Sequence, residues 1–197
     1  SAGAEGVATT SLNNASTGLD FMATSSTLGI EYHTASDFLA DGMKMSFSTS
    51  TDNGAAAGAT YRVDSHVAIG ATYVTDLGDS AVTVGAGYSA SDGSKTSTAV
   101  TSDDGGFHVG LSAVTGDLTV AVGFADGDKN GLGAYRSTMS LDGEVTKLGV
   151  KYVSGDLTFN VGVAAGEGKD NAAGATGGSD DSKDTTSASV SYAVASG

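Results

Sequence analysis

Cysteine is absent from this sequence, and so are proline and tryptophan. Without cysteine the chain has no disulfide, thiol nucleophile or cysteine metal ligand, and it suits an oxidising compartment, where a stray thiol is a liability. Basic residues are scarce, with nine Lys and Arg against 23 Asp and Glu. The resulting net charge of −14 argues against a nucleic-acid partner, because nucleic-acid binding needs a basic surface. The same negative charge favours cations as partners of the chain.

Long apolar runs are also missing. No stretch approaches the 18 or so apolar residues of a transmembrane helix, so the chain is expected to be either soluble or a membrane β-barrel. No signal peptide begins at Ser1, which predicts a mature chain or an internal fragment.

Motifs for catalysis are missing as well. The three histidines show no metal-ligand spacing, and no nucleophile elbow surrounds a serine. The fragment Gly85-Ala-Gly87-Tyr-Ser-Ala90 imitates a dinucleotide fingerprint, but its glycines fit strand alternation and no helix follows. We therefore expect no enzymatic activity and no organic cofactor.

What the sequence does contain is a repeated hairpin. Residues 107–124 and 146–163 carry the same pattern 39 positions apart, so that Gly116-Asp-Leu-Thr119 is matched by Gly155-Asp-Leu-Thr158. Internal repetition of this kind indicates one supersecondary unit used again. Within each unit the period is two, which predicts β-strands.

The two faces of these predicted strands differ in chemistry. Leu118, Val120, Val122 and Phe124 alternate with Thr119, Ala121 and Gly123. A soluble sheet usually covers its wet face with Lys, Glu, Arg and Thr, whereas this face is mostly Gly, Ala, Ser and Thr. Keeping charge off the strands favours an apolar face in lipid, where a Lys or Arg at mid-depth costs about 2–4 kcal/mol.

About ten strands can be placed from Thr27 onward, most of them close to the 9–11 residues that a tilted strand needs to cross a bilayer. They are expected at 27–34, 42–50, 55–63, 66–75, 80–90, 106–114, 118–125, 144–153, 157–165 and 185–195. Residues 1–26 lack periodicity and are expected to form a loop segment, with a role at a constriction left open. Residues 27–197 are expected to form the barrel strands and loops.

The predicted connections alternate between short and long. Short turns are expected at 76–79, 115–117 and 154–156, and long acidic links at 91–105, 126–143 and 166–184. Outer-membrane barrels show this asymmetry, with short periplasmic turns and long external loops. One connection, near 64–66, breaks the pattern because it is short where a long one is expected. Four tyrosines toward strand ends fit an aromatic girdle: Tyr73, Tyr88, Tyr152 and Tyr192.

These features resemble the Gram-negative general porins, particularly the trimeric alphaproteobacterial type. The resemblance lies in Gly-rich hairpins such as Val67-Ala-Ile-Gly-Ala-Thr-Tyr73 and Leu148-Gly-Val-Lys-Tyr152, spread over residues 27–195. It implies a homotrimer of sixteen-stranded, water-filled barrels in the cell outer membrane, passing small hydrophilic solutes and ions by passive diffusion. Because ten strands are too few and the chain stops at Ser196-Gly197 without a terminal aromatic, we expect part of a larger barrel.

Two sets of candidate site residues follow. In a porin constriction, acidic residues on an infolded loop face Arg and Lys across the lumen. The pore-lining candidates here are Arg62, His108, Arg136, Lys147, Lys151 and Asn160. The acidic balance predicts cation preference. A second motif, Asp126-Gly-Asp128-Lys-Asn130-Gly131, matches the first half of a calcium loop, but its twelfth position is Ser137 instead of Glu. Calcium at Asp126, Asp128 and Asn130 therefore stays open beside an ordinary acidic turn.

Two other function classes stay open. A secreted, acidic, calcium-binding β-rich surface protein, such as an adhesin or filament subunit, would explain the acidity but not the small residues on the polar face. A soluble sugar-binding or hydrolytic β-protein lacks the tryptophans and paired acids expected of such sites.

Overall fold

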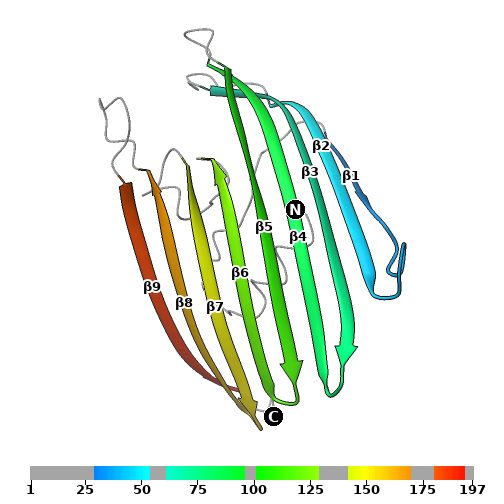
Figure 1. Ribbon diagram of the computed structural model, residues 1–197, viewed down its shortest axis with the longest axis vertical. Helices are drawn as coiled ribbons and strands as arrows, with labels where there is room; N and C mark the ends of the chain where they lie inside the picture. Colours follow the sequence, from blue (N-terminus) through cyan, green and yellow to red (C-terminus); the bar gives the residue numbers. More distant parts are fainter. Residues whose placement is uncertain (1–28, 54–60, 96–100, 129–141, 170–179, 194–197) are drawn as a thin grey trace.

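The computed structural model describes residues 29–53, 61–95, 101–128, 142–169 and 180–193. They form one antiparallel sheet of nine strands in which each strand pairs with the next along the chain (Figure 1). The strands are β1 (Gly29–His33), β2 (Met43–Asn53), β3 (Tyr61–Leu77), β4 (Ser80–Lys95), β5 (Thr101–Thr115), β6 (Leu118–Asp128), β7 (Asp142–Ser154), β8 (Leu157–Lys169) and β9 (Asp180–Tyr192).

The all-β, antiparallel prediction is confirmed. Within the described ranges, no helix is long and apolar enough to cross a membrane. The segment 1–26, expected to be a loop, lies outside the described residues.

Three two-residue turns close the hairpins at the same end of the sheet, as the sequence predicts. Gly78, Gly116 and Gly155 have φ values of +64°, +55° and +58°, and each is followed by an Asp outside the positive-φ region. This φ pattern belongs to the type II′ turn, whose twist suits paired strands and whose first position favours glycine. The two copies of the repeated hairpin therefore have the same strand register. Ala113 pairs with Val120 in the first copy, and Tyr152 pairs with Phe159 at the matching positions of the second.

Two kinds of boundary prediction are wrong. Parts of the long links expected at 91–105, 126–143 and 166–184 belong to strands β4 to β9, because the strand pairing continues beyond the alternating apolar residues: 91–95, 101–105, 126–128, 142–143, 166–169 and 180–184.

Strands 55–63 and 66–75 were expected to be separated by a short connection at 64–66, but Asp64 and His66 lie inside the continuous strand β3. The pairing of β3 with β4 shifts between Val63 and Ser65, so the polar residues mark an irregularity in the ladder and not a turn. The count in the described part is therefore nine strands, and the connection from β2 to β3 falls on 54–60, at the end opposite the two-residue turns.

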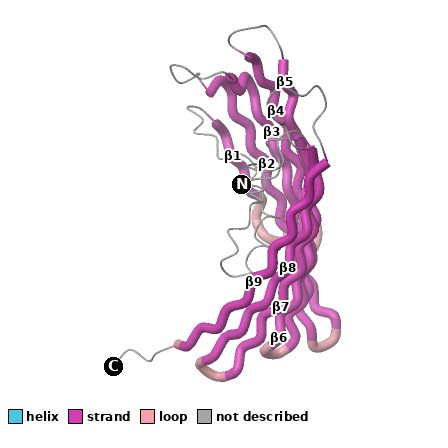
Figure 2. The backbone as a smooth tube through the Cα atoms, turned by 90° about the vertical axis from the view of Figure 1, so that its left-hand side faces the viewer, coloured by secondary structure: helices cyan, strands magenta, loops and turns pink. Residues whose placement is uncertain are grey.

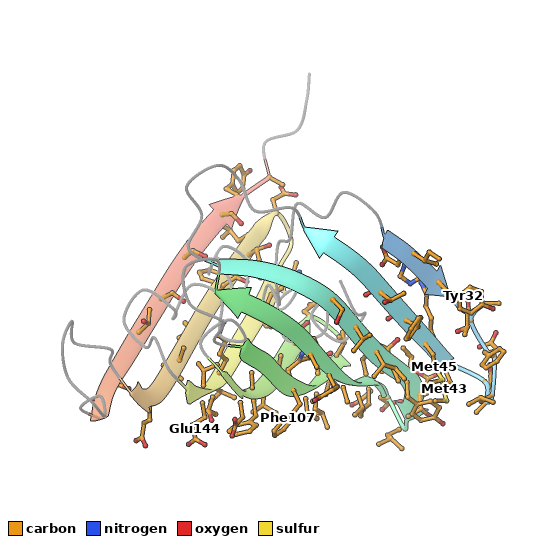
Figure 3. All side chains as sticks on the ribbon, turned by 90° about the horizontal axis from the view of Figure 1, so that it is seen from above. Tyr32, Met43, Met45, Phe107 and Glu144 are labelled. Carbon is orange, nitrogen blue, oxygen red and sulfur yellow. The ribbon has the colours of Figure 1, made fainter. Side chains whose placement is uncertain are left out.

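The sheet is strongly curved. Figure 2 shows the strands bending along their length, and the view from above shows the sheet as an arch (Figure 3). Tyr32, Met43, Met45 and Phe107 lie on the outer, convex side of that arch. Side chains converge on the concave side of a bent sheet and spread apart on the convex side. The concave side therefore needs small residues, whereas the convex side has room for bulky ones.

Candidate pore wall and its apolar outer surface

The concave face consists mainly of small side chains. The strand register sets Gly85 beside Gly110, Gly110 beside Gly123, and Gly149 beside Gly162. Ala, Ser and Thr occupy most neighbouring positions, and a few larger polar groups stand among them. The buried side chains of this face in the described part are Ser46, Ala68, Ser89, His108, Ser112, Ala121, Ala125, Val145, Lys147 and Asn160.

The convex face carries the opposite chemistry. Leu111, Val122 and Leu148 lie in one cross-strand row near the middle of the sheet and are 42%, 42% and 44% exposed. The same face is mostly apolar from β1 to β8, whereas on β9 it carries Asp184 and Thr186 as well as Val190 and Tyr192. An apolar surface that extends over eight strands is far larger than the patches that soluble monomers expose, and it indicates a contact with lipid or protein.

Acidic side chains end this apolar surface on the side of the long connections. Asp126 pairs with Glu144, and Glu144 pairs with Glu167, so three carboxylates lie side by side on β6, β7 and β8. All three are exposed, and Glu144 points outward from the convex face (Figure 3). Charges here mark where the outer surface becomes compatible with water.

Three of the four tyrosines expected in a girdle, Tyr73, Tyr152 and Tyr192, lie on the opposite boundary and run obliquely across the strands. The fourth, Tyr88, pairs with Phe107 in the row of Asp126 and Glu144. The cross-strand row that starts at Tyr73 on β3 reaches β7 at Leu148 and β9 at Thr186. Tyr152 lies four residues beyond Leu148, and Tyr192 lies six residues beyond Thr186, each toward the two-residue turns.

The tyrosine line therefore descends by about one residue per strand. With a rise of about 3.3 Å per residue and a strand spacing of about 4.8 Å, this slope corresponds to strands tilted by about 35° from the normal to that line. Closed barrels tilt their strands by about 35–45°.

Four of the six pore-lining candidates lie together on the concave face. His108 is on β5, Lys147 and Lys151 are on β7, and Asn160 is on β8 directly opposite Lys151. Three of these side chains are buried, with exposures of 4% for His108, 4% for Lys147 and 7% for Asn160. Lys151 is half-buried. A role in lining a pore stays a prediction for all four.

The side chains of the two remaining pore-lining candidates, Arg62 and Arg136, are not placed. Arg62 lies in β3 but its side chain is outside the described residues, as is the whole of Arg136. Of the calcium candidates, Asp126 is exposed on the convex face, Asp128 ends β6, and Asn130 lies outside the described residues. Among the side chains described, no group of three metal-ligating residues comes together. The calcium loop stays a prediction.

Two polar features of the concave face were not among the sequence candidates. Lys44 shares this face with Ser46 because the two alternate with Met43 and Met45, and that alternation was sufficient to identify it. The second feature is a hydrogen bond from Asn160 Nδ2 to Ser189 Oγ, 3.2 Å long, between β8 and β9. It depends on a register set across a long connection, which the sequence does not reveal.

No protein-family model matches the sequence, and a search of curated proteins gives no match.

Proposed function

We propose that this chain forms part of the wall of an outer-membrane porin, a closed barrel through which small hydrophilic solutes and ions diffuse passively. The convex face meets lipid and the concave face lines the water-filled lumen. Further strands complete a barrel of the sixteen-stranded type, and three such barrels associate as a homotrimer.

One observation carries this proposal: the apolar surface of the convex face lies between an oblique line of tyrosines and a row of carboxylates. Tyr73, Tyr152 and Tyr192 mark the boundary near the two-residue turns. On the other side the surface is still apolar at Phe107 on β5, whereas the residues paired next in that row are Asp126 and Glu144. A band of this form is expected where tilted strands cross a slab of hydrocarbon with aromatic and charged residues at its surfaces.

The interior chemistry supports a channel more than a packed core. A soluble sandwich buries its apolar face, so its larger hydrophobic side chains would be covered and its charges would point outward. Here the apolar side chains are exposed, and Lys147, Lys151 and Asn160 are on the concave side. The net charge of −14 favours cations over anions in the pore.

The test is reconstitution of the protein, purified in detergent, into planar bilayers. We expect stepwise conductance in groups of three and, under a KCl gradient, a reversal potential of the sign for cation preference. A protein that stays soluble without detergent and produces no conductance would contradict the porin. The acidic surface protein with calcium at Asp126 and Asp128 would then be the better explanation.

A further inference from the structure

The connection between β1 and β2 differs from its neighbours at the same end of the sheet. The other three connections described there are two-residue turns, whereas this one runs from Thr34 to Gly42 (Figure 1). It presents two adjacent apolar side chains, Phe38 and Leu39, which are 55% and 67% exposed. Single exposed apolar residues are ordinary on a protein surface, but an adjacent pair beside a large apolar surface indicates a contact.

Hydrogen bonds hold this connection in one conformation. The backbone N–H groups of Asp37 and Phe38 both donate to Met43 O, over 2.8 and 3.3 Å. Gly42 N donates a 2.7 Å bond to Asp37 Oδ1, and Gly42 O accepts a 2.9 Å bond from Val74 N on β3. The exposed pair is therefore carried by backbone that is already ordered, so a contact costs little further conformational entropy.

Met43 fixes the depth of the exposed pair relative to the tyrosine line. Phe38 is hydrogen-bonded to Met43, and Met43 pairs with Tyr73. Phe38 thus takes the place of β1 in that cross-strand row, two strands away from Tyr73. Because the line moves by about one residue per strand, it passes about two residues from Phe38. This places the backbone of Phe38 about 5 Å outside the line, toward the two-residue turns.

Leu77 shows that exposure alone does not give this depth. It is 64% exposed, but it lies four residues beyond Tyr73 on β3, which is about 11 Å outside the line. The headgroup layer on each side of the hydrocarbon is about 5–8 Å thick. With the tyrosines at the inner surface of that layer, Phe38 falls inside it and Leu77 extends past it.

The composition of the connection suits a membrane surface. Apolar side chains such as Phe and Leu are stabilised at the boundary between headgroups and acyl chains. Asp37 and Asp41 are exposed, so their carboxylates can stay in water while the apolar pair inserts. Met43 lies on the convex side of the sheet (Figure 3) and joins the pair to the apolar surface that meets lipid in the proposed barrel.

We propose that residues 34–42 form an interfacial anchor in which Phe38 and Leu39 enter the headgroup layer of the surrounding phospholipid, an inference that rests on the proposed porin function. The anchor contacts lipid from outside the strands. It fixes the height of the barrel wall at β1 and β2, on the side of the two-residue turns.

Single-tryptophan variants test the anchor, because the chain has no tryptophan of its own. Phe38→Trp, Leu77→Trp and Val122→Trp are reconstituted into vesicles of phosphatidylcholine brominated near the headgroup end or near the methyl end of its acyl chains. We expect the emission of Phe38→Trp to be lost most with bromine near the headgroup, and that of Val122→Trp with bromine near the methyl end. Leu77→Trp should keep the emission of a water-exposed indole in both.

Leu77→Trp is the matched control, because Leu77 is as exposed as the pair and lies at the same end of the sheet. KCl conductance equal to that of the unaltered chain shows that each variant has folded and inserted. If Phe38→Trp does not insert, Leu39→Trp takes its place, with the same expected loss of emission.

The outcomes separate the two proposals. Conducting Phe38→Trp channels whose emission is lost no more than that of Leu77→Trp would overturn the anchor and leave the porin intact. A blue-shifted emission that no brominated lipid reduces would do the same, since protein and not lipid would then cover the pair. An unaltered chain that never conducts would overturn the porin, and the anchor with it.

Discussion

Gly87 and His108 face each other across β4 and β5, and the imidazole occupies the space that a side chain at residue 87 would need. A Cβ atom on Gly87 would lie 2.5 Å from Cε1 and 2.8 Å from Nε2 of His108. His108 is 4% exposed, so its ring has little freedom to move aside. This pair explains why the concave face cannot accept even alanine at every glycine.

Gly87→Ala should destabilise the folded protein by about 1–3 kcal/mol, the usual cost of overpacking a close-packed site. The same substitution in a His108→Ala background should cost much less, because the atoms it meets are gone. Urea unfolding of the four proteins in lipid vesicles gives the coupling energy directly. Equal penalties in the two backgrounds would show that His108 does not restrict residue 87.

Gly42→Ala should be more damaging than Gly78→Ala. Both glycines have positive φ, +79° and +64°, so each alanine has to adopt the left-handed conformation at about 1–2 kcal/mol. A Cβ on Gly42 would also overlap the carbonyl oxygen of Val74, whereas one on Gly78 would meet nothing within 4 Å. We expect a further loss of about 1–3 kcal/mol for Gly42→Ala alone.

Thermal or urea unfolding compares the two variants, with Gly78→Ala as the measure of the conformational cost. The backbone hydrogen bond from Val74 N to Gly42 O, 2.9 Å long, should be lost together with the stability. A Gly42→Ala protein as stable as Gly78→Ala would mean that this corner of the sheet rearranges freely.

Val122→Lys and Asp126→Lys test whether the convex face meets lipid. The two residues are on the same face of β6, four positions apart, one in the middle of the apolar surface and one at its acidic boundary. In a bilayer, lysine should cost about 2–4 kcal/mol at residue 122 and about 0–1 kcal/mol at residue 126. Folding free energies in phospholipid vesicles measure both. A difference near zero would argue that the surface does not lie in hydrocarbon.

The slope of the tyrosine line predicts the orientation of the strands. If Tyr73, Tyr152 and Tyr192 lie at one membrane surface, the strands should be tilted by about 35° from the bilayer normal. Polarised infrared spectroscopy of the amide I band in oriented bilayers measures that tilt. Strands lying flat in the membrane plane, or without any preferred orientation, would contradict the placement.

The sequence was sufficient for those parts of the structure that depend on local periodicity. Alternation placed Val120 and Val122 on one face and Thr119 and Ala121 on the other, and Gly-Asp dipeptides located the turns after Leu77, Thr115 and Ser154. These features are decided by nearest neighbours along the chain, so they need no knowledge of the partner strand.

The remaining features depend on pairing between strands. Asp64, Ser65 and His66 resemble a turn in composition, yet they continue β3 because β4 pairs along its whole length with one shift of register. The contact of Asn160 with Ser189 requires β8 and β9 to align across residues 170–179. No local pattern encodes such alignments, and the contact of Asn160 with Ser189 could therefore not be predicted from the sequence.

The shared register of the two repeated hairpins has a consequence for how such a wall can change in width. Each hairpin adds two strands, returns the chain to the end where it began, and keeps the same residues inside and outside, as the equivalent pairs Ala113–Val120 and Tyr152–Phe159 illustrate. In the barrel proposed above, insertion or loss of one unit would thus alter the circumference in steps of about 12 Å at the inferred tilt. The diameter of that barrel would change in discrete increments, with the chemistry of both surfaces inherited unchanged.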